Sequence, residues 1–305
     1  MGDTTGISWC HHTFNPWWGC SRVSPACRFC YADRDARRWG MELWRRNGDR
    51  RLMSEAYWAK PRRWDREAAA AGERRRVFCA SMADVFEDHP QVSEARRRLF
   101  GLIEATPHLD WLLLTKRIEN VAAMVPWGDS WPPGVWMGTS LESPRFAWRI
   151  DELLKLRGAT VRFLSCEPLL AALDLGGSLQ AMWRCPACGM SNGHWTGSPR
   201  CFGCGTRTYP PPYSQVDWVI TGGESGPKAR PSHPDWFRSI RDQCQAAGVA
   251  YHHKQNGEFG PARNGETLQV RGETWPVWRY GKKAAGRELD GVIWDQFPEP
   301  LAVAA

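Results

Sequence analysis

Short apolar runs alternate with amphipathic stretches along most of the chain. The apolar runs predict β-strands at 77–82, 111–115, 135–139, 161–165, 218–221 and 250–254. Four of the stretches between them are suited to helices, at 93–105, 118–124, 143–155 and 234–247. The last is the clearest, because Trp236, Ile240 and Cys244 recur at helical spacing, a proline lies near its start and Gly248 follows its end.

This alternation predicts an α/β fold in which helices cover a parallel sheet. Six strand–helix units without a Rossmann glycine fingerprint favour a full or partial TIM-type (β/α) barrel over an open doubly wound sheet. Residues 184–212 interrupt the pattern, and from about residue 257 short aromatic runs replace clear helices. We therefore expect a barrel built from 1–183 and 213–305, with an inserted module at 184–212 and a C-terminal tail.

Polar residues directly follow several predicted strands. In a barrel the carboxyl ends of the strands meet at one face, where active sites lie. Each charged residue alone could equally be a surface charge or part of a structural ion pair, and the Gly-Gly-Glu segment could be a tight turn with a solvated Glu, so their expected convergence is what makes them candidates. The set is Ser81, Asp84, Lys116, Arg117, Glu142, Glu167, Gly222, Gly223, Glu224 and Lys254.

The composition is that of a folded protein, with 42% hydrophobic and 24% charged residues among 305. The formal net charge of +7, carried mainly by arginine, favours an anionic partner, nucleic acid first, although a solvated basic surface explains it equally well. The 19 tryptophans suit both a core and base-stacking platforms, and composition does not separate these uses.

The 11 cysteines do not form the pattern of a disulfide scaffold, because their number is odd and the chain is long. The N-terminal sequence lacks a signal-peptide pattern, and no apolar run reaches the roughly 18 residues that span a bilayer. We expect a cytoplasmic protein without a membrane partner, in which clustered cysteines bind metal.

Three cysteines, Cys20, Cys27 and Cys30, lie in a C-x6-C-x2-C segment that Gly19 and Pro25 mark as a loop. Three thiolates on one loop can hold three irons of a 4Fe–4S cluster and leave the fourth iron open to another ligand. The alternatives are a zinc site completed by a nearby histidine and inert thiols. The six-residue gap is longer than usual in zinc knuckles, which favours the cluster.

The spacing, the aromatic residue after the last cysteine and the position ahead of a β/α repeat resemble the radical S-adenosylmethionine superfamily. The usual spacing there is C-x3-C-x2-C, so the first gap is longer here. The resemblance implies that S-adenosylmethionine binds the open iron. One electron, from a donor such as flavodoxin or ferredoxin, then cleaves it to a 5′-deoxyadenosyl radical.

The resemblance also implies cofactor-binding roles for the strand-end residues. Gly222, Gly223 and Glu224 would bind the methionine amine, although the corresponding Gly-Gly-Glu of the superfamily lies on an early strand and this one lies on a late strand. Carboxylates would hold a ribose hydroxyl or the amine, and cations would meet a carboxylate or phosphate. The carboxylates are Glu142 and Glu167, and the cations are Lys116, Arg117 and Lys254.

More narrowly, the chain is similar to an uncharacterised phage and mobile-element family with a three-cysteine motif, a domain of unknown function. The similarity covers most of the chain and indicates no substrate. The matching segments are NPWWGC at 15–20, CRFCYA at 27–32, LTKR at 114–117, GTSLE at 138–142, FLSCEPL at 163–169 and VITGGESG at 219–226.

A second cysteine set lies in the inserted module. Cys185 and Cys188 form one C-x2-C pair, Cys201 and Cys204 form another, and glycine follows each pair. This pattern is typical of a structural zinc ribbon with Zn²⁺, and a second iron–sulfur cluster is the rival interpretation. The ribbon could contact nucleic acid or support a loop beside the active site.

Together these features predict a radical S-adenosylmethionine enzyme that modifies or repairs a nucleic acid base or nucleotide, with DNA, RNA or a nucleotide as substrate. The alternative is a non-catalytic, zinc-dependent nucleic-acid-binding protein. A third possibility is a protein of radical-enzyme ancestry that no longer cleaves its cofactor.

Overall fold

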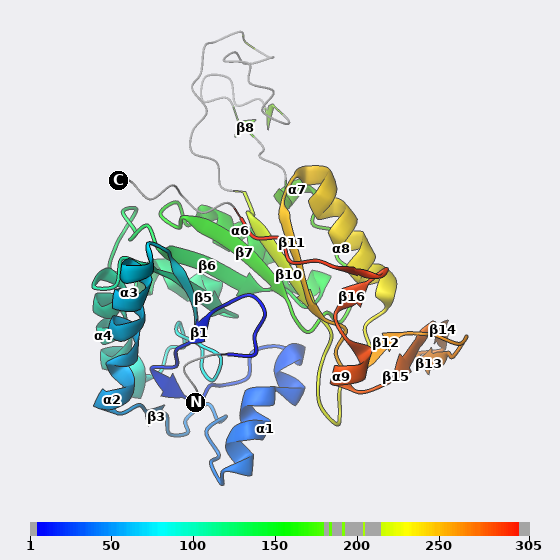
Figure 1. Cartoon of the computed structure of the whole chain (residues 1–305), viewed down its shortest axis with the longest axis horizontal. Helices are drawn as coiled ribbons and strands as arrows, with labels where there is room; N and C mark the ends of the chain where they lie inside the picture. Colours follow the sequence, from blue (N-terminus) through cyan, green and yellow to red (C-terminus); the bar gives the residue numbers. More distant parts are fainter. Residues whose placement is uncertain (1–4, 180–182, 185–190, 193–203, 205–214, 299–305) are drawn as a thin grey trace.

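The central feature of the chain is a seven-stranded parallel sheet (Figure 1). The computed structural model describes residues 5–179, 183–184, 191–192, 204 and 215–298. Strand order across the sheet follows the order in the sequence, so each strand joins its neighbour by a crossover. The strands are β1 (His12–Thr13), β4 (Arg75–Cys79), β5 (Leu109–Thr115), β6 (Val135–Ser140), β7 (Val161–Cys166), β10 (Trp218–Gly222) and β11 (Ala250–Gln255).

Helices cover the outer face of the sheet. Figure 1 shows α3 and α4 beside one end of it and α8 along the other. The longer helices are α3 (Lys60–Ala71), α4 (Ser93–Glu104), α6 (Trp148–Lys155) and α8 (Pro234–Ala247), and α1 (Tyr31–Arg38) follows the cysteine loop. The short ones are α2 (Glu55–Trp58), α5 (Val121–Met124), α7 (Gly176–Leu179) and α9 (Lys282–Ala285), with 3-10 turns at Pro25–Phe29, Pro90–Val92, Ile118–Asn120 and Pro144–Phe146.

Alternating side chains of the strands build two cores. On the outer face, Trp111 and Tyr251 belong to a large cluster that includes buried residues of α3, α4, α6 and α8. On the inner face, Phe78 and Trp218 pack with Trp9 from the N-terminal segment. Because strand side chains alternate between faces, apolar residues on both faces mean that the sheet is buried on both sides.

The sheet curls into a half-barrel with two edges, β1 and β11. A late segment of the chain protects the β11 edge. There His253 N–H donates to the Trp294 carbonyl (3.0 Å), and Gln296 N–H donates to the Tyr251 carbonyl (3.1 Å). Main-chain bonds of this kind satisfy groups that an open edge would leave unpaired.

The remaining strands form small two-stranded pairs. They are β2 (Trp17–Trp18) with β3 (Arg51–Leu52), β8 (Trp183–Arg184) with β9 (Ser191–Asn192), β12 (Phe259–Pro261) with β15 (Val277–Arg279), β13 (Leu268–Val270) with β14 (Glu273–Trp275), and β16 (Glu288–Leu289) with β17 (Val292–Ile293). No helix in the described part of the chain has both the length and the apolar character needed to cross a bilayer.

The α/β class and the parallel sheet are confirmed, and of the two predicted barrels the partial one is observed. All six predicted strands are present, and α8 has the predicted bounds. The segment 118–124 differs, because it divides into a 3-10 turn and the single-turn helix α5. The sequence prediction missed β1 and α3. Most of the inserted module lies outside the described residues, so its predicted bounds stay a prediction.

Candidate functional site

Cys20, Cys27 and Cys30 line one cavity of about 160 Å³. The 3-10 turn Pro25–Phe29 contains the second cysteine, and α1 begins directly after the third, so the C-x2-C pair is held at a turn entering a helix. Much of the remaining wall comes from the carboxyl ends of the parallel strands, and these strand-end residues meet beside the cysteine loop. They include Ser81, Asp84, Lys116, Arg117, Ser140, Ser165, Glu167 and Lys254.

A buried ion network holds the first part of the cysteine loop. Arg117 donates to the Ser21 carbonyl and to Ser21 Oγ (both 2.8 Å), and to Asp84 Oδ2 (2.9 Å). It also donates to Cys20 Sγ at 3.5 Å. Burial raises the pKa of the Cys20 thiol, and the Arg117 charge opposes this effect. Arg117 therefore positions Cys20 and offsets part of the effect of burial on its pKa.

Glu87 completes this network from the other side of the loop. Its carboxylate accepts from Ser21 N–H (2.7 Å) and Ser21 Oγ (2.6 Å). It also accepts from Arg50 Nε (2.8 Å) and Nη2 (2.9 Å), and both side chains of this pair are almost wholly buried. Burial acts to raise the pKa of Glu87, but hydrogen bonds from Arg50 and Ser21 outweigh it, so the carboxyl stays below its ordinary pKa.

A second, larger cavity of about 830 Å³ adjoins the first. Six residues line both cavities, namely Cys30, Tyr31, Ser81, Lys116, Glu167 and Lys254. Glu167 and Lys254 form an ion pair at 3.1 Å, and Lys116 Nζ donates to Ser140 Oγ at 3.0 Å. A ligand in the larger cavity would therefore lie against the third cysteine as well as against charged groups of both signs.

The Gly-Gly-Glu segment borders the larger cavity, and its two glycines lie close to neighbouring atoms. A Cβ on Gly222 would lie 2.4 Å from Glu167 Oε1, and one on Gly223 would lie 1.9 Å from the Asn256 carbonyl oxygen. Close approach of the neighbouring backbone thus accounts for Gly223. Glu224 lines the cavity, but Arg230 donates to both of its carboxylate oxygens.

Arg230 also connects the Gly-Gly-Glu segment to the cysteine loop. Its Nη1 donates to the Pro25 carbonyl at 3.1 Å, and its guanidinium lies 5.2 Å from the centre of the Phe29 ring. The Glu224–Arg230 pair therefore holds the turn that contains Cys27.

The structure does not bring Glu142 to either cavity. Its carboxylate is fully buried and pairs with Arg149 of α6 at 3.0 Å. In the sequence, Glu142 and Glu167 each follow shortly after a predicted strand, but only Glu167 lines the two cavities.

The two histidines near the cysteine loop in sequence, His11 and His12, do not line the cysteine-lined cavity. His11 Nδ1 accepts from Arg76 N–H at 2.8 Å, and the His12 ring stacks on Trp64 with centroids 4.3 Å apart. In the described part of the chain, no three His, Cys, Asp or Glu side chains are close enough to share one metal ion. A single zinc needs all its sulfurs at about 2.3 Å from one centre. Cluster thiolates instead bind separate irons, so a cluster does not require the three sulfurs to meet at one centre.

The zinc-ribbon prediction cannot be located in the structure. Cys185, Cys188 and Cys201 lie outside the described residues, and Cys204 is described and exposed.

Several residues that the sequence analysis did not select also line the larger cavity. The Tyr31 hydroxyl donates to the Ser81 carbonyl at 2.8 Å and its ring borders both cavities. The others are the cations Arg34, Lys282, Lys283 and Arg287. Only the aromatic residue after the third cysteine had a sequence signal, because the late cations follow no predicted strand.

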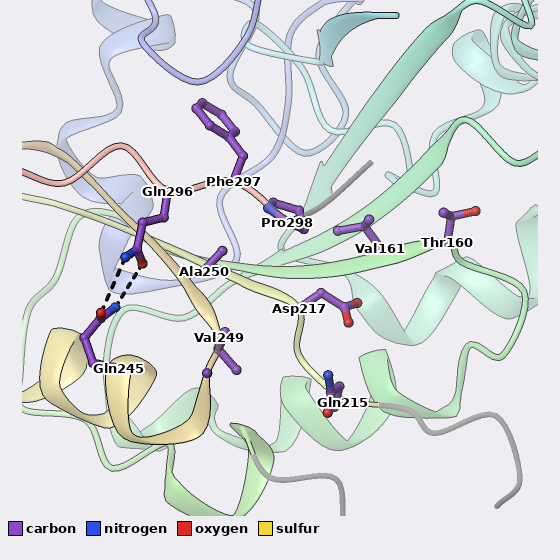
Figure 2. A pocket seen from close by; sticks show the side chains of 11 residues that line it. Thr160, Val161, Gln215, Asp217, Gln245, Val249, Ala250, Gln296, Phe297 and Pro298 are labelled. Atoms are coloured by element: carbon purple, nitrogen blue, oxygen red, sulfur yellow. Dashed lines mark hydrogen bonds between the residues drawn. The ribbon is translucent and has the colours of Figure 1, made fainter. Parts of the chain in front are cut away.

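Another cavity, of about 530 Å³, lies at the opposite end of the sheet (Figure 2). It borders the amino-terminal ends of β7, β10 and β11, where Gln245 and Gln296 hydrogen-bond to each other. Its described lining holds no cysteine, histidine, lysine or arginine. It therefore lacks the chemistry of the cysteine-lined cavity.

A family model described as "Protein of unknown function (DUF5131)" matches residues 4–298. The chain belongs to this family. Membership confirms the expected placement in a family of unknown function, whereas the likeness to the radical S-adenosylmethionine superfamily stays a prediction. No curated protein matches the chain.

Two solved structures of spore photoproduct lyase are similar to parts of the DUF5131 chain. A mutant with bound AdoMet and dinucleoside spore photoproduct is 16% identical, with a TM-score of 0.41 over 55% of this chain and 48% of that one. The DUF5131 chain thus spans about half the length of that structure. A cysteine-to-serine mutant is 13% identical, with a TM-score of 0.47 over 93% of this chain and 72% of that one. At such identities and TM-scores, the likeness establishes neither a shared fold nor a shared activity.

Proposed function

We propose that this protein is a radical S-adenosylmethionine enzyme whose 4Fe–4S cluster is held by Cys20, Cys27 and Cys30. The observation that carries the proposal is the meeting of all three thiols in one cavity at the carboxyl ends of a parallel half-barrel. Thiolates are the usual protein ligands of iron–sulfur clusters, and three of them leave one iron open.

The adjoining cavity suits the cofactor that would occupy the open iron. When bound, cluster and S-adenosylmethionine together supply a radical able to abstract a hydrogen atom from a substrate. The residues around the third cysteine would orient the cofactor, with Glu167 accepting from its amine or ribose hydroxyls and Lys254 or Lys116 donating to its carboxylate. Glu224 and Arg117 would act indirectly, by holding the loop through Arg230 and Ser21.

For the substrate we propose a nucleic acid base or a nucleotide. The net charge of +7 and the excess of cations around the larger cavity support an anionic substrate. The cavity has room beyond the cofactor only for a small group or one end of a polymer, since its volume is about 830 Å³.

The experiment is a metal and product analysis of protein purified and reconstituted without oxygen. We expect about four irons per chain and a reduced-cluster EPR signal that changes on addition of S-adenosylmethionine. We also expect 5′-deoxyadenosine once dithionite is present. The predicted ribbon would add about one zinc.

Cysteine variants make the test specific. Replacing Cys20, Cys27 or Cys30 singly by Ala should abolish iron binding and 5′-deoxyadenosine formation. The control is Cys244→Ala, because this thiol is buried in α8 and lines neither cavity of the site. Iron retained in the three loop variants would refute the assignment. About two zincs and no iron in the wild type would favour the non-catalytic nucleic-acid-binding protein instead.

A further inference from the structure

Six cations from separate parts of the chain converge on the larger cavity. Three acidic residues, Asp35, Glu167 and Glu224, share its wall. The cations come from α1, from the end of β5, from β11 and from the segment that contains α9. They are Arg34, Lys116, Lys254, Lys282, Lys283 and Arg287.

The three acidic residues are already paired. Glu167 binds Lys254, and Glu224 binds Arg230, which is not part of the cavity wall. Asp35 lies 3.3 Å from Arg34 Nε. None of the three is ion-paired with Lys282 or Lys283.

Three of the cations have no carboxylate partner within the described residues. Lys116 Nζ donates to Ser140 Oγ, whereas the side chains of Lys282 and Lys283 make no hydrogen bond and no ion pair with described residues. Partial burial lowers the pKa of Lys282, and the nearby charges of Lys254 and Arg34 lower it further, which outweighs the opposing effect of Glu167 and Glu258. Unbalanced positive charge of this kind is relieved by binding an anion.

The turn that bears the two lysines is fixed to the end of the sheet. Asn256, next to β11, donates from Nδ2 to the Ala285 carbonyl (2.9 Å) and from its N–H to the Gly286 carbonyl (2.9 Å). Gly281 N–H donates to the Glu258 carbonyl at 3.0 Å. These hydrogen bonds hold the backbone of α9 beside the larger cavity, and they do not involve the side chains of Lys282 and Lys283.

We propose that Lys282 and Lys283 bind a phosphate group of the substrate at the mouth of the larger cavity. Lysine suits this role because a phosphate accepts hydrogen bonds from ammonium groups in many orientations. The proposed phosphate site rests on the proposed function in one respect, since we place the meeting of substrate and cofactor in the larger cavity. It restricts the substrate to phosphate-bearing molecules, either a free nucleotide or a nucleic acid strand.

The test measures binding of a fluorescein-labelled single-stranded DNA by fluorescence anisotropy. With an oligonucleotide of about 15 nucleotides, the double variant Lys282→Ala/Lys283→Ala should bind about tenfold more weakly at about 50 mM salt. The dependence of log K on log salt should become shallower by about 1.4, because each phosphate contact on a single strand contributes about 0.7. Competition by thymidine monophosphate, but not by thymidine, would identify a free nucleotide as the source of the phosphate.

A matched variant controls for net charge. Lys60→Ala/Lys155→Ala removes two lysines from α3 and α6, outside both cavities. Equal weakening in this variant would overturn the proposal, because charge alone would then explain the effect. An unchanged salt dependence in the Lys282/Lys283 variant would also overturn it.

Cofactor binding separates this inference from the proposed function. Calorimetric titration with S-adenosylmethionine should give the same affinity in wild type and in the Lys282/Lys283 variant. Loss of that affinity with unchanged DNA binding would mean that the lysines serve the cofactor carboxylate, which would overturn the phosphate site. A wild type without iron that still shows the lysine-dependent salt slope would refute the radical enzyme and keep the phosphate site.

Discussion

Replacing Glu87 by Gln tests how the cysteine loop is held in place. The wild-type carboxylate accepts two hydrogen bonds from Ser21, next to Cys20, and two from Arg50. Gln keeps the shape and one acceptor oxygen, but it removes the charge and turns an NH2 group towards these donors. Arg50 is then left positively charged in a fully buried position, with backbone carbonyls and one neutral amide oxygen as its acceptors.

The expected magnitude follows from this burial. Breaking a buried ion pair from one side costs about 3–5 kcal/mol. Because Gln retains one acceptor, we expect the free energy of unfolding to fall by about 3 kcal/mol, at the lower end of that range. At about 2–4 °C for each kcal/mol, this corresponds to a melting temperature lower by roughly 6–12 °C.

Thermal unfolding of the metal-free protein measures the effect, and the rate at which a thiol reagent labels Cys20 reports on the loop. Glu55→Gln is the control, because Glu55 pairs with Arg98 at the surface and should leave the melting temperature unchanged. Lowering the pH should reduce the difference in melting temperature between wild type and Glu87→Gln. A carboxyl whose pKa is lowered by folding from its ordinary 4.5 stabilises the protein above that pH and stops doing so as pH falls through the folded-state value. A Glu87→Gln melting temperature equal to that of the control would refute the proposed anchoring.

Two further predictions concern the turn after β10 and its buried neighbours. Gly223→Ala should lower the free energy of unfolding, measured in urea, by about 1–3 kcal/mol, because the new Cβ meets the Asn256 carbonyl. The control Gly101→Ala, which has open space around it in α4, should raise the free energy of unfolding. Equal effects of the two substitutions would contradict the close approach at Gly223. His253 is buried against Thr221, and burial lowers its pKa from 6.5 to about 4, so the unfolded chain takes up more protons between these values. The urea midpoint should therefore fall as pH drops from about 6.5 towards 4, and it should fall less in His253→Gln; parallel pH profiles would exclude this role.

The strands could be predicted from sequence because their signal is local. A buried parallel strand presents apolar residues on both faces, and most of the recognised runs meet this condition, whereas 250–254 contains the buried His252 and His253. β1 was missed because it has only two residues, and α3 was missed because charged residues and a run of four alanines hide its apolar face. In a segment such as α3, the sequence alone does not show which side chains pack against the sheet.

The cysteine loop and its place in the sequence were also visible, since spacing and turn residues are properties of one segment. The roles of the cations and carboxylates were not. Lys116 and Arg117 are adjacent in sequence, yet Lys116 lies between two cavities while Arg117 holds the loop through Ser21 and Asp84. The different roles of Lys116 and Arg117 depend on which groups contact each side chain after folding.

The sequence by itself determined the parallel α/β class and the three-cysteine loop ahead of it, because both follow from local patterns of apolar residues, turn residues and spacing. Only the tertiary structure decided which charged groups line the cavity. Glu142 forms a buried ion pair with Arg149 of α6, whereas Glu167 lines the cavity. Lys282 also lines the cavity, although it lies in a segment with no strand signal. The physical reason is that burial and pairing of a charge depend on partners distant in sequence, and the folded chain alone brings those partners together.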